Sequence, residues 1–179
     1  MEKYVWIFPV LFIFHDMEEI IGYGIWLKKN RAMLDEKYPK ISRIYENYST
    51  EGMALAAFEE LLLCLLFCIL ALMTKNKMIW LIWLGGFIAY AFHLLIHICQ
   101  SLFIRKYIPC FITSIIVLPI SIWQIYECIL ELQCTVSAVI LFSSVGMIIV
   151  ALNLKFAQFL IGKFTKCVYY IYQFLVILR

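Results

Sequence analysis

Ionisable side chains lie inside stretches of the sequence that are otherwise apolar. They are His15, Glu18 and Glu19 in the first stretch, Glu59 and Glu60 in the second, and His93 and His97 in the third. Charged side chains inside a bilayer cost several kcal/mol, so they face the protein interior and pair there. Imidazole nitrogens and carboxylate oxygens together are ligands for zinc, iron and manganese. The set therefore predicts a divalent-metal site, with zinc as the first choice and di-iron or manganese as alternatives.

Helical spacing places the ionisable residues of the first and third stretches on shared helix faces. His15 and Glu19 are four residues apart, and Glu18 is three residues from His15, so all three can lie on one face. His93 and His97 are likewise separated by about one helical turn. Either face can contribute several ligands to one site, and all five residues are candidate ligands.

The second stretch contributes two adjacent glutamates at a matching depth. Glu59 and Glu60 diverge by ~100° around a helix, so we expect one of them to point inward, and either could be a ligand. Both lie ~10–12 Å from the end of their stretch, at ~1.5 Å per residue. Glu19 lies ~12 Å and His97 ~10 Å from the corresponding ends of their own stretches. Three helices therefore bring polar residues to one level.

A site of this composition suggests a reaction. Glu18 is a candidate ligand or general base, and His93 is a candidate ligand or proton donor. Hydrolysis or group transfer on a lipid or another apolar small molecule is the favoured hypothesis, because mixed His and Glu zinc sites often activate water. A di-iron oxidase or desaturase is the alternative within the enzyme class, since carboxylate-rich sites also hold iron.

Two other hypotheses explain the polar residues without a metal-dependent enzyme. The carboxylates and imidazoles could form a polar core in which they share protons among themselves. They could also line the path of a small proton- or cation-coupled transporter, or bind a ligand in a membrane protein without catalysis.

The elements that must position these residues are transmembrane helices. The chain has 179 residues, of which 65% are hydrophobic and 15% are charged, whereas a soluble domain has about a quarter charged residues. This length accommodates about five spans of ~20 apolar residues each. The predicted fold is an all-α polytopic transmembrane bundle in a single domain, with spans at roughly 4–27, 52–73, 78–104, 107–126 and 135–154.

The C-terminal segment and the basic residues predict how the bundle lies in the membrane. Residues 155–179 include Lys163 and Lys166 and end in a short apolar run, so we expect an interfacial helix, with a sixth span as the alternative. Most Lys and Arg residues follow the first, third and fifth spans, which places those connections in the cytoplasm and the N-terminus outside. The net charge of +3 is modest and gives no indication of nucleic-acid binding.

The run His-Asp-Met-Glu-Glu at residues 15–19 resembles the signature of the HXXEE family of small bacterial integral membrane proteins. The resemblance covers roughly the first 120 residues. Within its later part the matching positions are His97, Arg105, Tyr107, Pro109, Thr113 and Pro119. The sequence departs from the family pattern at Cys110, where Gly is expected, and at His93, where Asn is common. The resemblance implies a protein of the bacterial plasma membrane with a polar site, and it implies no substrate.

Overall fold

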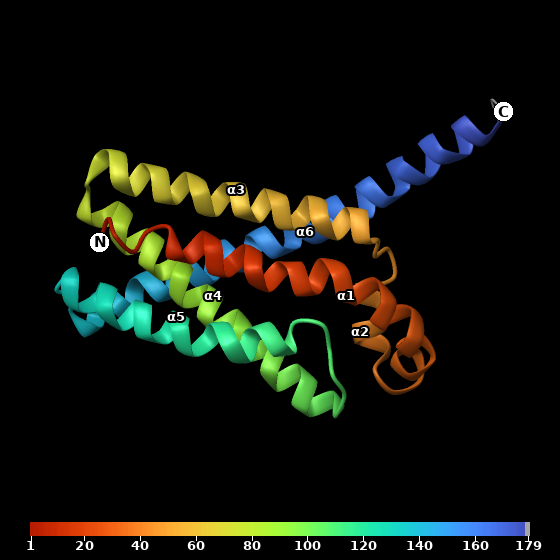
Figure 1. Ribbon diagram of the computed structural model, residues 1–179, viewed down its shortest axis with the longest axis horizontal. Helices are drawn as coiled ribbons and strands as arrows, with labels where there is room; N and C mark the ends of the chain where they lie inside the picture. The colour runs from red at the N-terminus through yellow and green to blue at the C-terminus, as the bar shows by residue number, and fades with distance from the viewer. Residues whose placement is uncertain (178–179) are drawn as a thin grey trace.

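The computed structural model describes residues 1–177, and within that range the chain forms six helices and no strand. The helices are α1 (Ile7–Lys37), α2 (Pro39–Ile44), α3 (Thr50–Thr74), α4 (Lys77–Ile104), α5 (Phe111–Glu131) and α6 (Val136–Ile177). The long helices lie side by side as a bundle, and the short α2 covers one end of it (Figure 1). The all-α bundle predicted from the sequence is confirmed.

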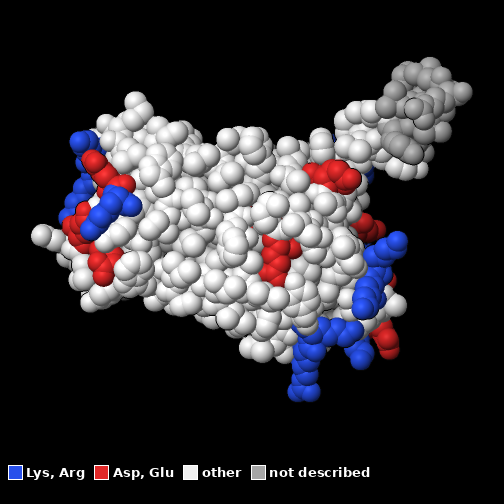
Figure 2. All heavy atoms as spheres, viewed as in Figure 1, with Lys and Arg blue, Asp and Glu red and all other residues white. Residues whose placement is uncertain are grey.

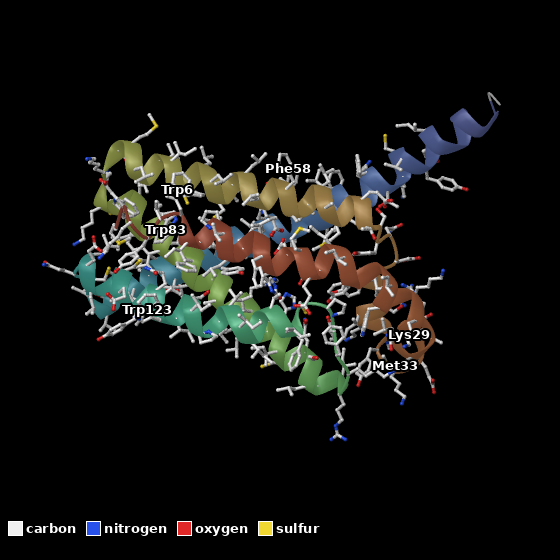
Figure 3. All side chains as sticks on the ribbon, viewed as in Figure 1. Trp6, Lys29, Met33, Phe58, Trp83 and Trp123 are labelled. Carbon is white, nitrogen blue, oxygen red and sulfur yellow. The ribbon has the colours of Figure 1, made fainter. Side chains whose placement is uncertain are left out.

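The surface of the bundle fits an integral membrane protein. Among the described residues, four helices are long and apolar enough to cross a membrane, namely α3, α4, α5 and α6. Their outer faces carry large apolar side chains such as Phe58 of α3, which is 55% exposed and points away from the bundle (Figure 3). Figure 2 shows Lys and Arg gathered at the two ends of the long axis, with a largely uncharged surface between them.

The first predicted span is part of a longer helix. α1 continues to Lys37 instead of ending near Leu27, and it packs against α3 and α5. Its apolar part contains Asp16, Glu18 and Glu19. Because of these three acidic residues, α1 is not among the four helices that are apolar enough to cross a membrane by composition. The passage of α1 through the membrane stays a prediction.

The fourth predicted span begins later than expected. α5 begins at Phe111 and not at Tyr107, because the connection from α4 turns through Pro109 before the helix starts. A Cβ added at Gly22 of α1 would lie 2.5 Å from Cβ of Pro109, so the connection packs directly on α1. Trp26 Nε1 also donates a hydrogen bond to the carbonyl oxygen of Tyr107 at 2.5 Å. These contacts hold the start of α5 against the middle of α1.

The fifth predicted span and the C-terminal segment form one helix. α6 runs from Val136 to Ile177 without a break at Lys155, because the segment after Lys155 contains no proline and a single glycine. Its 42 residues rise ~63 Å, about twice the thickness of the hydrocarbon core. The C-terminal part of α6 projects past the beginning of α3 (Figure 1). The separate C-terminal helix expected from the sequence is therefore a continuation of α6.

α4 and α6 cross in backbone contact at two glycines. A Cβ added at Gly85 would lie 2.1 Å from the carbonyl oxygen of Phe142, and one added at Gly146 would lie 2.1 Å from that of Gly85. Neither position can carry a larger side chain unless the helices separate. α4 also packs on α1 through stacked rings of Phe8 and Phe87, whose centroids are 4.7 Å apart. The two contacts fix which face of α4 is turned toward α1.

Candidate metal centre

α1 and α4 bring four potential metal ligands together. One ligand atom from each of His15, Glu19, His93 and His97 lies within 4.8 Å of the others. His97 Nε2 is 3.0 Å from Glu19 Oε1 and 2.7 Å from His93 Nε2. His15 Nε2 is 3.7 Å from the same carboxylate oxygen. Each helix contributes a pair of residues spaced by one turn, so the faces predicted from the sequence meet.

The four side chains differ in burial. His15 is fully buried, and Glu19 and His97 are each 7% exposed. His93 is only partly buried, and it lines two cavities of the bundle. His15 and His97 are therefore enclosed by protein, whereas His93 borders both cavities and Glu19 borders one of them.

The hydrogen bonds of His15 fix which of its nitrogens can bind a metal. His15 Nδ1 lies 2.8 Å from Thr113 Oγ1 at the start of α5. The same hydroxyl donates to Glu18 Oε2 at 2.5 Å, so its oxygen accepts a hydrogen bond from His15 Nδ1–H. The tautomer assigned from this network leaves a lone pair on His15 Nε2, which points into the cluster.

Two of the converging atoms have no hydrogen-bond partner in the described part of the chain, whereas His97 Nε2 lies within hydrogen-bond distance of His93 Nε2. His97 Nδ1 lies 3.2 Å from Gln100 Oε1, so it donates there and leaves a lone pair on Nε2. Among the described residues, His15 Nε2 and Glu19 Oε1 are buried atoms without a hydrogen-bond partner. Buried polar atoms normally have partners. Convergent acceptors that lack a donor fit a divalent cation, which accepts electron pairs from all of them.

Glu18 lies outside this group of four and contacts it through Thr113, whose hydroxyl also contacts His15. Its carboxylate accepts hydrogen bonds from the backbone N–H of Thr113 at 2.8 Å and from the Tyr107 hydroxyl at 2.6 Å, besides that of the Thr113 hydroxyl. Burial, followed by the hydrogen bond to Glu18, raises the pKa of Tyr107 to about 12. Tyr107 therefore stays a neutral donor. Glu18 is linked to His15 through the Thr113 hydroxyl and is not among the converging ligand atoms.

The two glutamates of α3 point in different directions, as their adjacency predicts. Glu59 Oε2 accepts a hydrogen bond from Asn153 Nδ2 of α6 at 3.2 Å, so it is engaged between α3 and α6. Glu60 is turned toward the site and lines the same two cavities as His93. Asp16, which is 5% exposed, lines one of these cavities with it. Neither glutamate of α3 belongs to the group of four.

Sequence reasoning missed the residues that orient the histidines. Gln100 lies three residues after His97 on the same helix, and this spacing could have identified it as a hydrogen-bond partner. Thr113 could not be found in this way, because it reaches His15 only through the fold, 98 residues away along the chain.

A protein-family model matches more than half of the chain. Residues 6–124 match the family described as "protein of unknown function with HXXEE motif". This range includes α1, α3 and α4, and so it contains all four residues of the cluster. No curated protein and no solved structure matches the chain.

Proposed function

The chain belongs to the HXXEE family, and we propose that it is a metal-dependent enzyme of the membrane that hydrolyses a lipid-like substrate or transfers a group from it. The observation that carries the proposal is the convergence of His15, Glu19, His93 and His97 on one largely buried point, where His15 Nε2 and Glu19 Oε1 have no hydrogen-bond partner among the described residues. A polar core that merely shared protons would not leave such atoms without partners.

Zinc suits the donor set better than a pair of iron or manganese ions. Three imidazoles and one carboxylate form the close group in the described part of the chain, and such a mixture is common in mononuclear zinc sites. Bundle proteins that hold two metal ions use several glutamates together with their histidines. Glu59 and Glu60 lie outside the close group. A zinc hydrolase or transferase is therefore favoured over a di-iron oxidase or desaturase.

The differing burial of the ligands suggests their roles. Structural zinc sites use four protein ligands, whereas catalytic sites keep one position open to solvent or substrate. We assign the three buried residues, His15, Glu19 and His97, as permanent ligands. His93 faces the cavities and serves as a fourth ligand or a proton donor on the side from which substrate approaches.

The chemistry divides between the ion and residues of the chain. A bound divalent ion would supply Lewis-acid polarisation and an activated water. Glu60 lies at the cavity wall beside His93, and we assign it as the general base of the proposed reaction. Glu18 already accepts hydrogen bonds from Tyr107 and Thr113, so it positions His15 and does not act as a general base.

Metal analysis of the purified protein tests this proposal. We expect about one zinc ion per chain after mild purification in detergent, and less than about a tenth as much in His15→Ala and Glu19→Gln variants. Glu59→Gln is the matched control, because it changes a glutamate that is hydrogen-bonded to α6. Equal metal content in the wild type and both ligand variants, or none in the wild type after zinc is added, would overturn the proposal.

A proton- or cation-coupled transporter is the second candidate. Asp16, Glu19 and Glu60 line one cavity together, which would suit a cation on its way through the bundle. Flux into proteoliposomes that is lost in Glu19→Gln, from a protein that holds no stoichiometric metal, would favour the transporter over the enzyme.

A further inference from the structure

An apolar cavity lies between α1, α3, α4 and α6 and ends at the proposed metal centre. It encloses about 770 Å³, including space open to the surroundings, and it is lined by aromatic and aliphatic side chains such as Phe12, Phe67 and Val150. Trp83, labelled in Figure 3, belongs to the same wall.

The cavity changes from apolar to polar along its length. On α4 it extends from Ile82 to His93, which corresponds to ~16 Å at ~1.5 Å per residue. Trp83 and Gly146 line it near the Ile82 end, whereas Glu60 and Asn153 line it near His93. One end is therefore enclosed by hydrocarbon groups, and the other presents polar side chains beside the metal ligands.

A second cavity meets the first at this polar end. It encloses about 1170 Å³, again including open space, and it reaches Glu19 and Asp16 from the segment of Tyr45 and Tyr48 that precedes α3. Glu60 and His93 line both cavities. The proposed metal centre thus lies where an apolar chamber joins a chamber whose walls carry both polar and apolar side chains.

These observations identify the kind of molecule that fits. Apolar cavities stay free of water, and in a membrane the abundant apolar occupant is an alkyl chain. An alkyl chain without a polar end group would leave Glu60, His93 and Asn153 facing hydrocarbon, and burying polar groups without partners costs free energy. We infer that the substrate is an amphiphile with one alkyl chain, which lies in the first cavity, and with a polar group that lies at Glu60 and His93 and extends into the second cavity. This inference rests on the proposed function.

Gly86 offers a way to fill the apolar cavity without disturbing the helices. The nearest neighbour of a Cβ added there is a ring carbon of Phe8 at 4.0 Å, so a leucine side chain can enter the open space. Ser144→Leu is the matched control, because it adds the same side chain on an exposed face of α6. Val150→Phe fills the same cavity from α6 and replaces Gly86→Leu in the experiment if that variant does not fold.

Photo-crosslinking of the intact, purified protein tests the inference. The probes are monoacylglycerols with a diazirine either at the end of the alkyl chain or next to the polar group. We expect the first to label the region of Trp83 and Gly146 and the second the region of His93 and Leu154, as located by mass spectrometry. Labelling should saturate, should be displaced by unlabelled monoacylglycerol, and should fall several-fold in Gly86→Leu or Val150→Phe but not in Ser144→Leu.

The possible outcomes separate this inference from the proposed function. Labelling that does not saturate, or that is equally strong at the exposed residues Leu62 and Leu66 and unchanged by Gly86→Leu, would overturn the inference even if zinc binds. The same experiment in Glu19→Gln should still label the apolar cavity, because Glu19 does not line it. Saturable cavity labelling in a wild-type protein that binds no metal would support an amphiphile site and overturn the metal enzyme.

Discussion

At the scale of residues, the three residues that the HXXEE motif specifies, His15, Glu18 and Glu19, have separate structural tasks. His15 and Glu19 direct their atoms into the cluster, whereas Glu18 accepts hydrogen bonds from the start of α5. Thr113 joins the two sides, because its hydroxyl contacts both Glu18 and His15. A metal-ligating histidine depends on such a partner for its tautomer and ring orientation.

Replacing Thr113 by valine tests this link. The change removes the acceptor for His15 Nδ1–H and the donor to Glu18 while the shape of the side chain is kept. We expect zinc affinity to fall ~10–100-fold, the usual effect of losing a partner of a metal-bound histidine. Competition with a chromophoric chelator measures it, and Thr113→Ser should restore most of the affinity. Unchanged affinity in Thr113→Val would contradict the role of Thr113.

Tyr107 allows a test that depends on pH. Because burial and the hydrogen bond to Glu18 raise its pKa to about 12, the phenol keeps its proton up to about pH 10. The ratio of zinc affinities between the wild type and Tyr107→Phe should therefore stay constant from about pH 7 to about pH 10. Chelator competition at several pH values gives this ratio. A ratio that approached unity within that interval would mean that the Tyr107 hydroxyl loses its proton at a lower pH than expected.

At the scale of elements, the site depends on how α4 is rotated against its neighbours. The crossing of Gly85 and Gly146 sets one side of α4 against α6, and the stacked rings of Phe8 and Phe87 set another against α1. His93 and His97 then face α1 at the level of its acidic residues. The packing of the connection before α5 on Gly22 brings Thr113 to the same level.

The two adjacent glycines of α4 give opposite predictions for stability. Gly85→Val would insert a side chain where Phe142 backbone lies 2.1 Å from the new Cβ, so we expect a loss of ~1–3 kcal/mol or more from overpacking. Gly86→Ala has open space and gains ~1 kcal/mol or less from helix propensity. Thermal unfolding in detergent, followed by tryptophan fluorescence, compares them. Similar midpoints for both variants would contradict the close crossing.

At the scale of the whole molecule, the charged connections gather at two ends. The N-terminus lies at the end that holds the α3–α4 and α5–α6 connections, and α2 and the α4–α5 connection lie at the other (Figure 1). Met1 there pairs with Glu131, and Glu2 pairs with Lys75. The basic residues of the other end predict that it faces the cytoplasm.

Cysteine accessibility in intact cells tests this orientation. A membrane-impermeant maleimide should add label to Lys3→Cys and none to Lys40→Cys, relative to the wild type, because both positions are exposed but lie at opposite ends. Labelling after cell lysis controls for reactivity and should modify both. The reverse pattern in intact cells would place the N-terminus in the cytoplasm.

The sequence by itself determined the all-α bundle of apolar helices, the family, and the pairing of candidate ligands by helical turn. These properties depend on composition and on the 3.6-residue period, which are local to each segment. Depth along each helix also follows from counting residues, and so the common level of Glu19 and His97 was predictable.

Only the tertiary structure decided which of the polar residues meet. Glu19 enters the cluster and Glu18 does not, and Glu60 faces the cavities while Glu59 contacts α6. The period of a helix gives the angle between two of its side chains but not the rotation of the helix against its neighbours. That rotation comes from contacts distant in the sequence, such as the glycine crossing of α4 and α6 and the hydrogen bond from α5 to His15.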